Sequence, residues 1–317
     1  MEGLGRTLQN LRTRKGPPMR FLVTGDLILD TTLVVDCWRD CSECEDAITV
    51  SERKHYNLGG AGNVARILAQ WGHEVRLEAA VGGDLKALYA IMLERCEIEN
   101  GLMGADWRNP EKIRVVSADG TIRCRHDVET VLPASWAGRF WECRDQDDWD
   151  MADVIVVSDY DKGLFSGGAC SDHWALGLVR QGTPVVADFK PANRRAFYGA
   201  TVVCPNEREA VEILGSRGWT CRGPTHGARC MRDIMGVQIA AVTVGRKGAS
   251  YSTVASWGEV PAPVRGPFAV GAGDVFTAAM AQGVARYGTR DPRALVEEAV
   301  RLASESTLRP RDPDLVV

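Results

Sequence analysis

The sequence predicts an α/β protein with a mostly parallel, doubly wound sheet. Three observations lead to this fold class. Short β-rich runs alternate with amphipathic stretches along most of the chain, the apolar runs each end in a polar residue or a glycine, and only two segments interrupt the alternation. Strand and helix alternation of this kind is typical of parallel sheets covered by helices on both faces.

We take the elements in chain order. Residues 1–19 contain four basic side chains and a Pro-Pro pair without periodicity, and we expect a flexible tail there. The fold is expected to occupy 20–317. The expected strands cover 20–25, 74–82, 154–160, 184–189, 201–206 and 240–245, and the expected helices cover 60–71, 84–95, 170–181, 206–214 and 275–288.

The ends of these strands predict where a ligand binds. In open α/β sheets, ligands bind outside the carboxyl ends of the strands. The residues expected at that edge are Asp26, Asp159, Asp188, Asn206 and Gly245.

Two segments, 31–57 and 112–129, alternate like exposed antiparallel strands. Ala118-Asp119-Gly120 is expected to form a hairpin turn in the second one. Together, the two segments predict a small β lid over the crevice.

Composition limits the classes of partner. The 317 residues are 45% hydrophobic and 25% charged, with 38 Lys+Arg against 42 Asp+Glu, a net charge of −4. No basic field is present to attract nucleic acid. No run approaches the length of a membrane helix, and the first residues lack the apolar centre of a secretory signal. We therefore expect a cytoplasmic protein that binds neither nucleic acid nor membranes.

Two glycine clusters stand out among the 33 glycines. Gly59-Gly60-Ala61-Gly62-Asn63 opens one expected helix, and Gly271-Ala272-Gly273-Asp274 opens another. Backbone N–H groups at a helix start can form an anion hole, and a carboxylate beside it suits phosphoryl transfer to a hydroxyl. Each cluster read alone is equally compatible with a turn or a helix cap. Neither matches a P-loop or a GxGxxG dinucleotide motif.

Seven motifs in sequence order resemble those of ribokinase-like (PfkB) sugar kinases. The strings GDLILD, SDYDKG and YGATVVCPN are most similar to the D-glycero-β-D-manno-heptose 7-phosphate kinases of that family. The motifs are GD at 25–26, GGAGN at 59–63, SDYDKG at 158–163, DFK at 188–190, PNEREA at 205–210, TVGRKG at 243–248 and GAGD at 271–274.

The resemblance implies a ribokinase-like three-layer sandwich with a β lid, and transfer of the ATP γ-phosphoryl group to a sugar hydroxyl. For the heptose kinases this hydroxyl is O1, and the product is the 1,7-bisphosphate. Asp274 matches the family's general base, and its anion hole matches Gly271, Ala272 and Gly273.

The resemblance also implies the remaining site residues. Asn206 and Glu209 match the NxxE that organises Mg²⁺ and its waters. Lys190 is expected near a phosphate, and the nucleotide groove is expected to include Thr243, Gly245 and Gly248. Sugar hydroxyls are expected to bind Asp26, Asp30, Gly59, Gly60 and Asn63. Candidates for a phosphate already on the sugar, with solvated surface charge as the alternative, are Lys162, Arg114 and Arg125.

Two departures from the family pattern keep a second hypothesis open. Phe268-Ala269-Val270 replaces the Asp and Thr near the family's monovalent-cation site, which makes potassium activation doubtful. Leu302 stands where relatives have an Asn near the adenine. A catalytically weak sugar- or nucleotide-binding protein on the same fold is the alternative, as is another PfkB-type sugar kinase. Homodimerisation through the lid is possible in this family.

The 10 cysteines suggest one further alternative. Cys37, Cys41 and Cys44 have the CxxxCxxC spacing of radical iron–sulfur enzymes, but they interrupt an expected lid strand. Cys221, His226 and Cys230 form a weaker metal-binding pattern. We expect most cysteines to act as small hydrophobic side chains, and Cys204 to be a core thiol.

Overall fold

A nine-stranded sheet lies at the centre of the protein. The structure is a computed structural model that describes residues 17–40, 47–117, 121–143, 149, 151–216, 218 and 222–316. The strand order is β15-β14-β13-β12-β11-β10-β1-β4-β6. All neighbours from β6 to β13 pair in parallel, whereas β14 and β15 are antiparallel. The sequence analysis predicted this mostly parallel sheet.

The central strands are β1 (Arg20–Gly25), β4 (Glu74–Glu78), β6 (Glu99–Asn100), β10 (Val154–Ser158), β11 (Val185–Asp188), β12 (Val202–Val203), β13 (Ile239–Thr243), β14 (Gly248–Ser252) and β15 (Trp257–Pro261). The helices are α1 (Ala61–Gln70), α2 (Lys86–Arg95), α3 (Ala134–Glu142), α5 (Trp174–Gln181), α6 (Glu207–Gly215), α7 (Pro224–Met235), α8 (Ala272–Tyr287) and α9 (Pro292–Ser306), with 3₁₀ turns η2 (Pro191–Phe197) and η3 (Gly245–Lys247).

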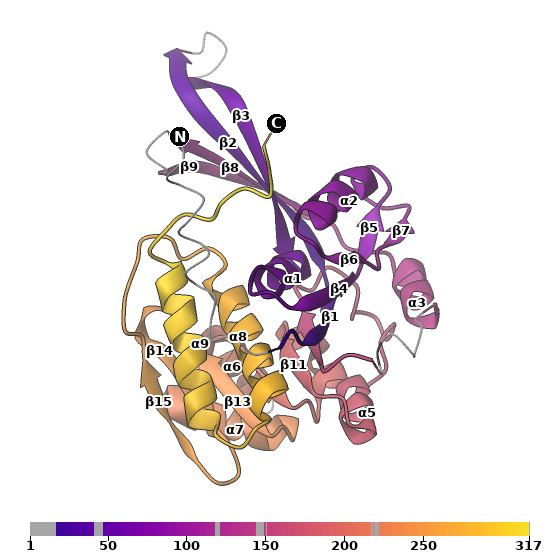
Figure 1. Cartoon of the computed structure of the whole chain (residues 1–317), viewed down its shortest axis with the longest axis vertical. Helices are drawn as coiled ribbons and strands as arrows, with labels where there is room; N and C mark the ends of the chain where they lie inside the picture. The colour runs from indigo at the N-terminus through magenta and orange to yellow at the C-terminus, as the bar shows by residue number, and fades with distance from the viewer. Residues whose placement is uncertain are drawn as a thin grey trace.

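The central sheet is apolar on both faces, because successive side chains of each strand point to opposite sides. Val154 and Val156 of β10 enter one buried cluster, and Ile155 and Val157 enter the other. Successive side chains of a strand point to opposite faces, so β10 contributes to both cores. Helices α1, α2, α8 and α9 pack into the first cluster, and α3, α5, α6 and α7 into the second. The expected three-layer α/β sandwich is confirmed (Figure 1).

The two interrupting segments form a second sheet that projects from the sandwich (Figure 1). Its order is β16-β3-β2-β8-β9, from β2 (Leu27–Asp40), β3 (Ala47–Gly60), β8 (Glu111–Ser117), β9 (Ile122–Val128) and β16 (Leu315–Val316). β2–β3 and β8–β9 are antiparallel, as expected, but β2 and β8 are joined in parallel. The expected turn at 118–120 lies outside the described residues, as does the expected tail except for 17–19.

Several boundaries differ from the expectations. The stretch 74–82 divides into β4 and β5 (Ala80–Gly82), and β5 pairs with β7 (Met103–Ala105) in a sheet of its own. Helix α5 begins at Trp174 rather than near 170, because His173 before it is left-handed, with φ 61°. The Gly-rich stretch around His226 forms helix α7, which the sequence analysis missed. Among the described helices, none is long and apolar enough to span a bilayer.

The structure describes only some of the cysteines that the sequence analysis discussed. Cys204 is buried, as expected of a core thiol. The side chains of Cys37, Cys41, Cys44 and Cys221 lie outside the described residues. Cys230 Sγ lies 3.7 Å from the His226 ring nitrogens, and the described part of the chain contains no group of three metal-binding side chains.

Candidate active site

The carboxyl ends of β11, β12 and β13 and the start of α8 enclose a polar cavity of about 180 Å³. This is the edge at which the strand ends predicted ligand binding. Its lining residues are Tyr160, Asp188, Lys190, Cys204, Asn206, Glu209, Thr243, Gly271, Gly273 and Asp274.

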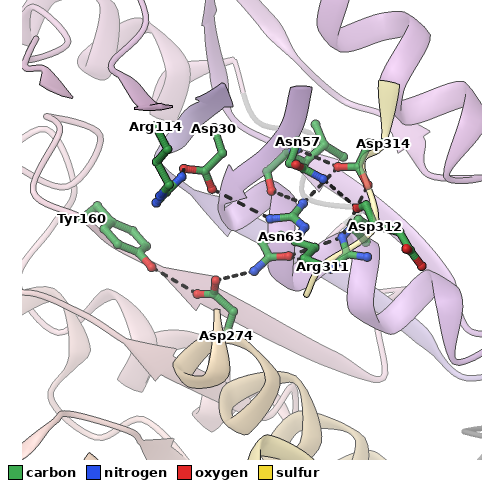
Figure 2. A network of polar contacts seen from close by, with 11 residues as sticks. Asp30, Asn57, Asn63, Arg114, Tyr160, Asp274, Arg311, Asp312 and Asp314 are labelled. Atoms are coloured by element: carbon green, nitrogen blue, oxygen red, sulfur yellow. Dashed lines mark hydrogen bonds and ion pairs between the residues drawn. The ribbon is translucent and has the colours of Figure 1, made fainter. Parts of the chain in front are cut away.

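Asp274 lies in the first turn of α8 with its side chain buried. Asn63 Nδ2 donates to one carboxylate oxygen (2.5 Å), and the Tyr160 hydroxyl donates to the other (3.1 Å). The two partners approach from opposite sides (Figure 2). Burial raises the pKa of Asp274 above its ordinary value, and both hydrogen bonds oppose this rise. The same carboxylate raises the pKa of Tyr160 well above 10, so the phenol remains a donor.

Gly271 and Gly273 precede Asp274, and only the first of them needs to be a glycine for structural reasons. Gly271 precedes α8 in the left-handed region, with φ 81°, and an added Cβ would lie 2.9 Å from Asn63 Nδ2. Around Gly273 a Cβ would meet open space. The Ala272 N–H already donates to the Ala269 carbonyl (3.3 Å). Of the three predicted anion-hole residues, Gly271 and Gly273 therefore line the cavity, whereas the Ala272 amide has a partner inside the turn.

The Asp26 carboxylate is bound by backbone groups. Its carboxylate accepts hydrogen bonds from the backbone N–H groups of Tyr160 (2.8 Å), Lys162 (3.0 Å) and Leu164 (3.4 Å). Burial raises its pKa, and these bonds counteract the rise. Asp26 therefore shapes the loop that holds Tyr160, and its expected role as a ligand of sugar hydroxyls stays a prediction.

Close packing explains why residues 59 and 60 are both glycines. A Cβ on Gly60 would lie 2.2 Å from the Asp26 carbonyl, and one on Gly59 would lie 2.8 Å from the Ile28 carbonyl. Both glycines let β3 approach β2 closely before α1 begins. Asn63, in the first turn of α1, is thereby brought to Asp274.

Asp30 and Arg114 meet on the lid side of Asp274. Arg114 donates to Asp30 (2.8 Å) from the neighbouring strand β8. Asp30 also lies 3.8 Å from Arg311, which the sequence analysis did not single out (Figure 2). Arg114, one of the predicted phosphate ligands, is thus an ion-pair partner of a predicted sugar ligand.

The other two predicted phosphate ligands also have carboxylate partners. Arg125 donates to Asp127 (2.7 Å), and its side chain is 50% exposed. Lys162 pairs with Glu129. The sequence analysis missed Lys112, whose ammonium lies 4.8 Å from the centroid of the Tyr160 ring. Its two-residue spacing from Arg114 on the same strand face was a signal for it.

The predicted metal residues form an N-terminal cap. The Asn206 side chain accepts from the Glu209 N–H (3.0 Å), and one Glu209 oxygen accepts from the Asn206 N–H (2.9 Å). The other Glu209 oxygen accepts from Lys190 Nζ (2.5 Å). Nearby, burial and then the Glu209 charge raise the pKa of Asp188 to about 8. These groups are committed to one another, so they fit a cation held through water better than direct coordination.

A second cavity, of about 260 Å³, adjoins the first at Thr243 and Gly273. Its floor is apolar, with Phe276 and Val300, and the predicted Gly245 and Gly248 lie on its wall. Helix α9 contributes Ala303 and Ser304, whereas Leu302 points into the core and is 4% exposed. The departure at Leu302 is therefore a core substitution and does not alter the wall of this pocket.

Comparison with known proteins now decides the family. The model of the pfkB family carbohydrate kinases matches residues 27–310. The chain belongs to the PfkB family of carbohydrate kinases.

Among curated proteins, this PfkB chain is 33% identical over 275 residues to the "Bifunctional protein HldE" of Pelobacter propionicus, covering 83% of the chain and 55% of the relative. It is 29% identical over 306 residues to the protein of the same name from Bradyrhizobium diazoefficiens, covering 90% and 59%. The chain thus spans little more than half the length of these relatives.

Solved structures support the same PfkB fold. Ribokinase from Thermotoga maritima superposes with a TM-score of 0.68 at 21% identity, covering 92% of this chain and 93% of that one. Phosphofructokinase-2 from Escherichia coli in complex with fructose-6-phosphate gives a TM-score of 0.71 at 17% identity, covering 92% and 94%. These likenesses confirm the ribokinase-like architecture.

Proposed function

We propose that the protein transfers the γ-phosphoryl group of ATP to a hydroxyl of a sugar phosphate, with O1 of a heptose 7-phosphate as the favoured acceptor. The observation that supports this is the buried Asp274 carboxylate, held by Asn63 and Tyr160 at the wall of a polar cavity. Likeness to the HldE proteins and the heptose-kinase motifs SDYDKG and YGATVVCPN favour the heptose.

Asp274 is the general base of this proposal. Its carboxylate takes the proton of the acceptor hydroxyl as that oxygen bonds to the γ-phosphorus, and the bond from the γ-phosphorus to the bridging oxygen of ADP breaks. The backbone at Gly271 and Gly273, at the positive end of α8, and the Lys190 ammonium stabilise the charge on the transferred group. The adjoining apolar cavity accommodates the adenine.

Magnesium would be held by the Asn206–Glu209 pair through water, with Asp188 as a further oxygen donor in the same cavity. When bound, the ion neutralises negative charge on the phosphates. Asn206 and Glu209 form the capping box at the start of α6, and Glu209 keeps Lys190 close.

The phosphate already on the sugar would bind basic side chains of the lid and of the loop after β10. Arg125 and Lys162 would exchange their carboxylate partners for it, and Lys112 would add a third positive charge beside Tyr160. A phosphate monoester is the type of group that such a cluster selects over an uncharged sugar.

The experiment is an ADP-release assay over a panel of sugar monophosphates, including D-glycero-β-D-manno-heptose 7-phosphate and fructose 6-phosphate, with Mg²⁺ and with or without potassium. We expect ADP release above the hydrolysis background with the heptose phosphate and little response to potassium. ADP release that is equal with and without every sugar would overturn the proposal.

A catalytically weak sensor on the same fold is the second candidate. Val270, directly before Gly271, is 56% exposed at the site where relatives carry polar residues, which favours it. For a sensor, sugar phosphate and ATP would raise the melting temperature without any turnover.

A further inference from the structure

The end of the described chain returns from α9 to the lid, and we call residues 311–316 the strap (Figure 1). Its strand β16 pairs antiparallel with β3 at His55 and Tyr56. Asn57 Nδ2 donates to the Asp312 carbonyl (2.9 Å), and Leu315 is buried. The strap is therefore docked along β3, directly before the Gly59-Gly60 turn.

Asp314 anchors the strap at the base of the lid. Its side chain is 4% exposed and accepts from the Leu58 N–H (2.7 Å) and from Arg311 (3.0 Å). It also lies 3.6 Å from Arg66, which donates to the side-chain oxygen Oδ1 of Asn63 (3.0 Å). A buried carboxylate with this many donors has a fixed position, and it fixes Arg311 in turn.

The Arg311 guanidinium lies between Asp314 and Asp30 (Figure 2). One nitrogen donates to the Leu58 carbonyl (2.6 Å) as well as to Asp314, and another lies 3.8 Å from the Asp30 carboxylate. Arg114 contacts the other Asp30 oxygen. Asp30 is thus held between an arginine of the lid and an arginine of the strap.

We propose that Arg311 is a positioning residue of the sugar site, which orients Asp30 toward the acceptor and brings a positive charge to the side of Asp274 away from the nucleotide. This rests on the proposed kinase function. The strap belongs to the site although it follows the last helix of the sandwich, since the same carboxylate, Asp314, fixes both Arg311 and Arg66, the latter a contact of Asn63.

The charge of Arg311 acts on Asp274 among several others. Asp274 is faced by Tyr160 after β10, by Asp30 of β2 and by Arg66 of α1, and across the cavity by Asp188, Lys190 and Glu209. Arg311 lowers the pKa of Asp274, whereas Asp30 raises it. Removing Arg311 takes away its lowering effect, while Asp30 keeps its partner Arg114, so the pKa of Asp274 rises.

The test compares Arg311→Gln, Arg311→Lys and the control Arg309→Gln, which removes an exposed arginine two residues away. With the most active sugar phosphate of the panel, we expect Arg311→Gln to raise the sugar KM on the order of tenfold or more, with the ATP KM unchanged. In the same variant, the acid limb of the pH profile of kcat/KM moves to higher pH, because the pKa of Asp274 rises. Arg311→Lys keeps the charge, and therefore the acid limb, but raises the sugar KM because an ammonium cannot bridge Asp30 and Leu58. Arg309→Gln changes neither quantity.

The outcomes separate the two proposals. If the wild type releases no ADP, or if Asp274→Asn remains fully active, the kinase proposal fails. If the wild type is active and both Arg311 variants match Arg309→Gln in sugar KM and pH profile, the strap proposal alone is overturned. Equal rises of the sugar and ATP KM values would also overturn it. Should Arg311→Gln fail to fold, Arg311→Lys decides the case by its sugar KM at an unchanged melting temperature.

Discussion

Asp274 is constrained by three parts of the chain that are far apart in sequence. Helix α8 carries it, α1 supplies Asn63, and the loop after β10 supplies Tyr160. Burial raises the pKa of Asp274 by favouring the neutral carboxyl, and the two donors partly oppose this by favouring the charged form. A base of this kind is oriented before the substrate arrives.

Asp274→Asn tests the base directly. The amide keeps the shape of the side chain but cannot take a proton, so we expect kcat to fall by about 10²–10⁴. The melting temperature should stay close to that of the wild type. The ADP-release assay and a thermal melt measure the two quantities, and an active Asn variant would remove Asp274 from the mechanism.

The pH dependence follows from the raised pKa of Asp274. The base must be ionised, so kcat/KM should fall as the pH drops through a pKa that lies above 3.8. The Tyr160 hydroxyl stabilises the ionised form, and Tyr160→Phe should therefore move this acid limb to higher pH. A pH–rate profile of both proteins measures it, and an unmoved limb would contradict the assigned contact.

Gly271 and Gly273 provide a matched pair for the backbone. Gly271→Ala meets both a left-handed conformation and the Asn63 amide, and we expect a loss of stability of about 1–2 kcal/mol. Gly273→Ala has open space and should leave the free energy of unfolding nearly unchanged. Urea unfolding of the two variants checks the difference, and equal losses would mean that α8 starts with another geometry.

At the scale of elements, α6 combines a structural cap with the proposed magnesium role. Asn206→Ala should lose about 1 kcal/mol of stability, whereas Asn206→Ser keeps a capping oxygen and should lose little. If Asn206 also orients the waters of the ion, the Ser variant will need more Mg²⁺ for half-maximal activity. An unchanged Mg²⁺ titration in the Ser variant would restrict Asn206 to the cap.

The elements also show which parts of the fold and of the site could be predicted from the sequence. Alternation predicted the parallel strands, because buried strands such as β10 are apolar on both faces. Motif order predicted Asp274, Asn63 and Lys190 in one site. The contacts of Asp26 could not be predicted, because the backbone amides that bind its carboxylate leave no side-chain pattern. Arg311 was missed for a different reason. Its partner Asp30 is more than 250 residues away in the sequence, so no local spacing connects the two side chains.

At the scale of the whole molecule, the sheet, the lid and the strap meet around Asp274. In the proposed function, the sandwich supplies the base and the nucleotide pocket, and the lid supplies Asp30 and two of the basic side chains. The strap holds the base of the lid against α1. This arrangement predicts that phosphoryl transfer needs all three parts in contact at once.

The most direct measurement of this account is phosphorus NMR of the reaction products from ATP and D-glycero-β-D-manno-heptose 7-phosphate. We expect the wild type to produce ADP and a second phosphate ester at the anomeric carbon, and Asp274→Asn to produce neither above background. ATP that remains intact, or that yields only inorganic phosphate, would contradict the assignment of this site to a heptose 7-phosphate kinase.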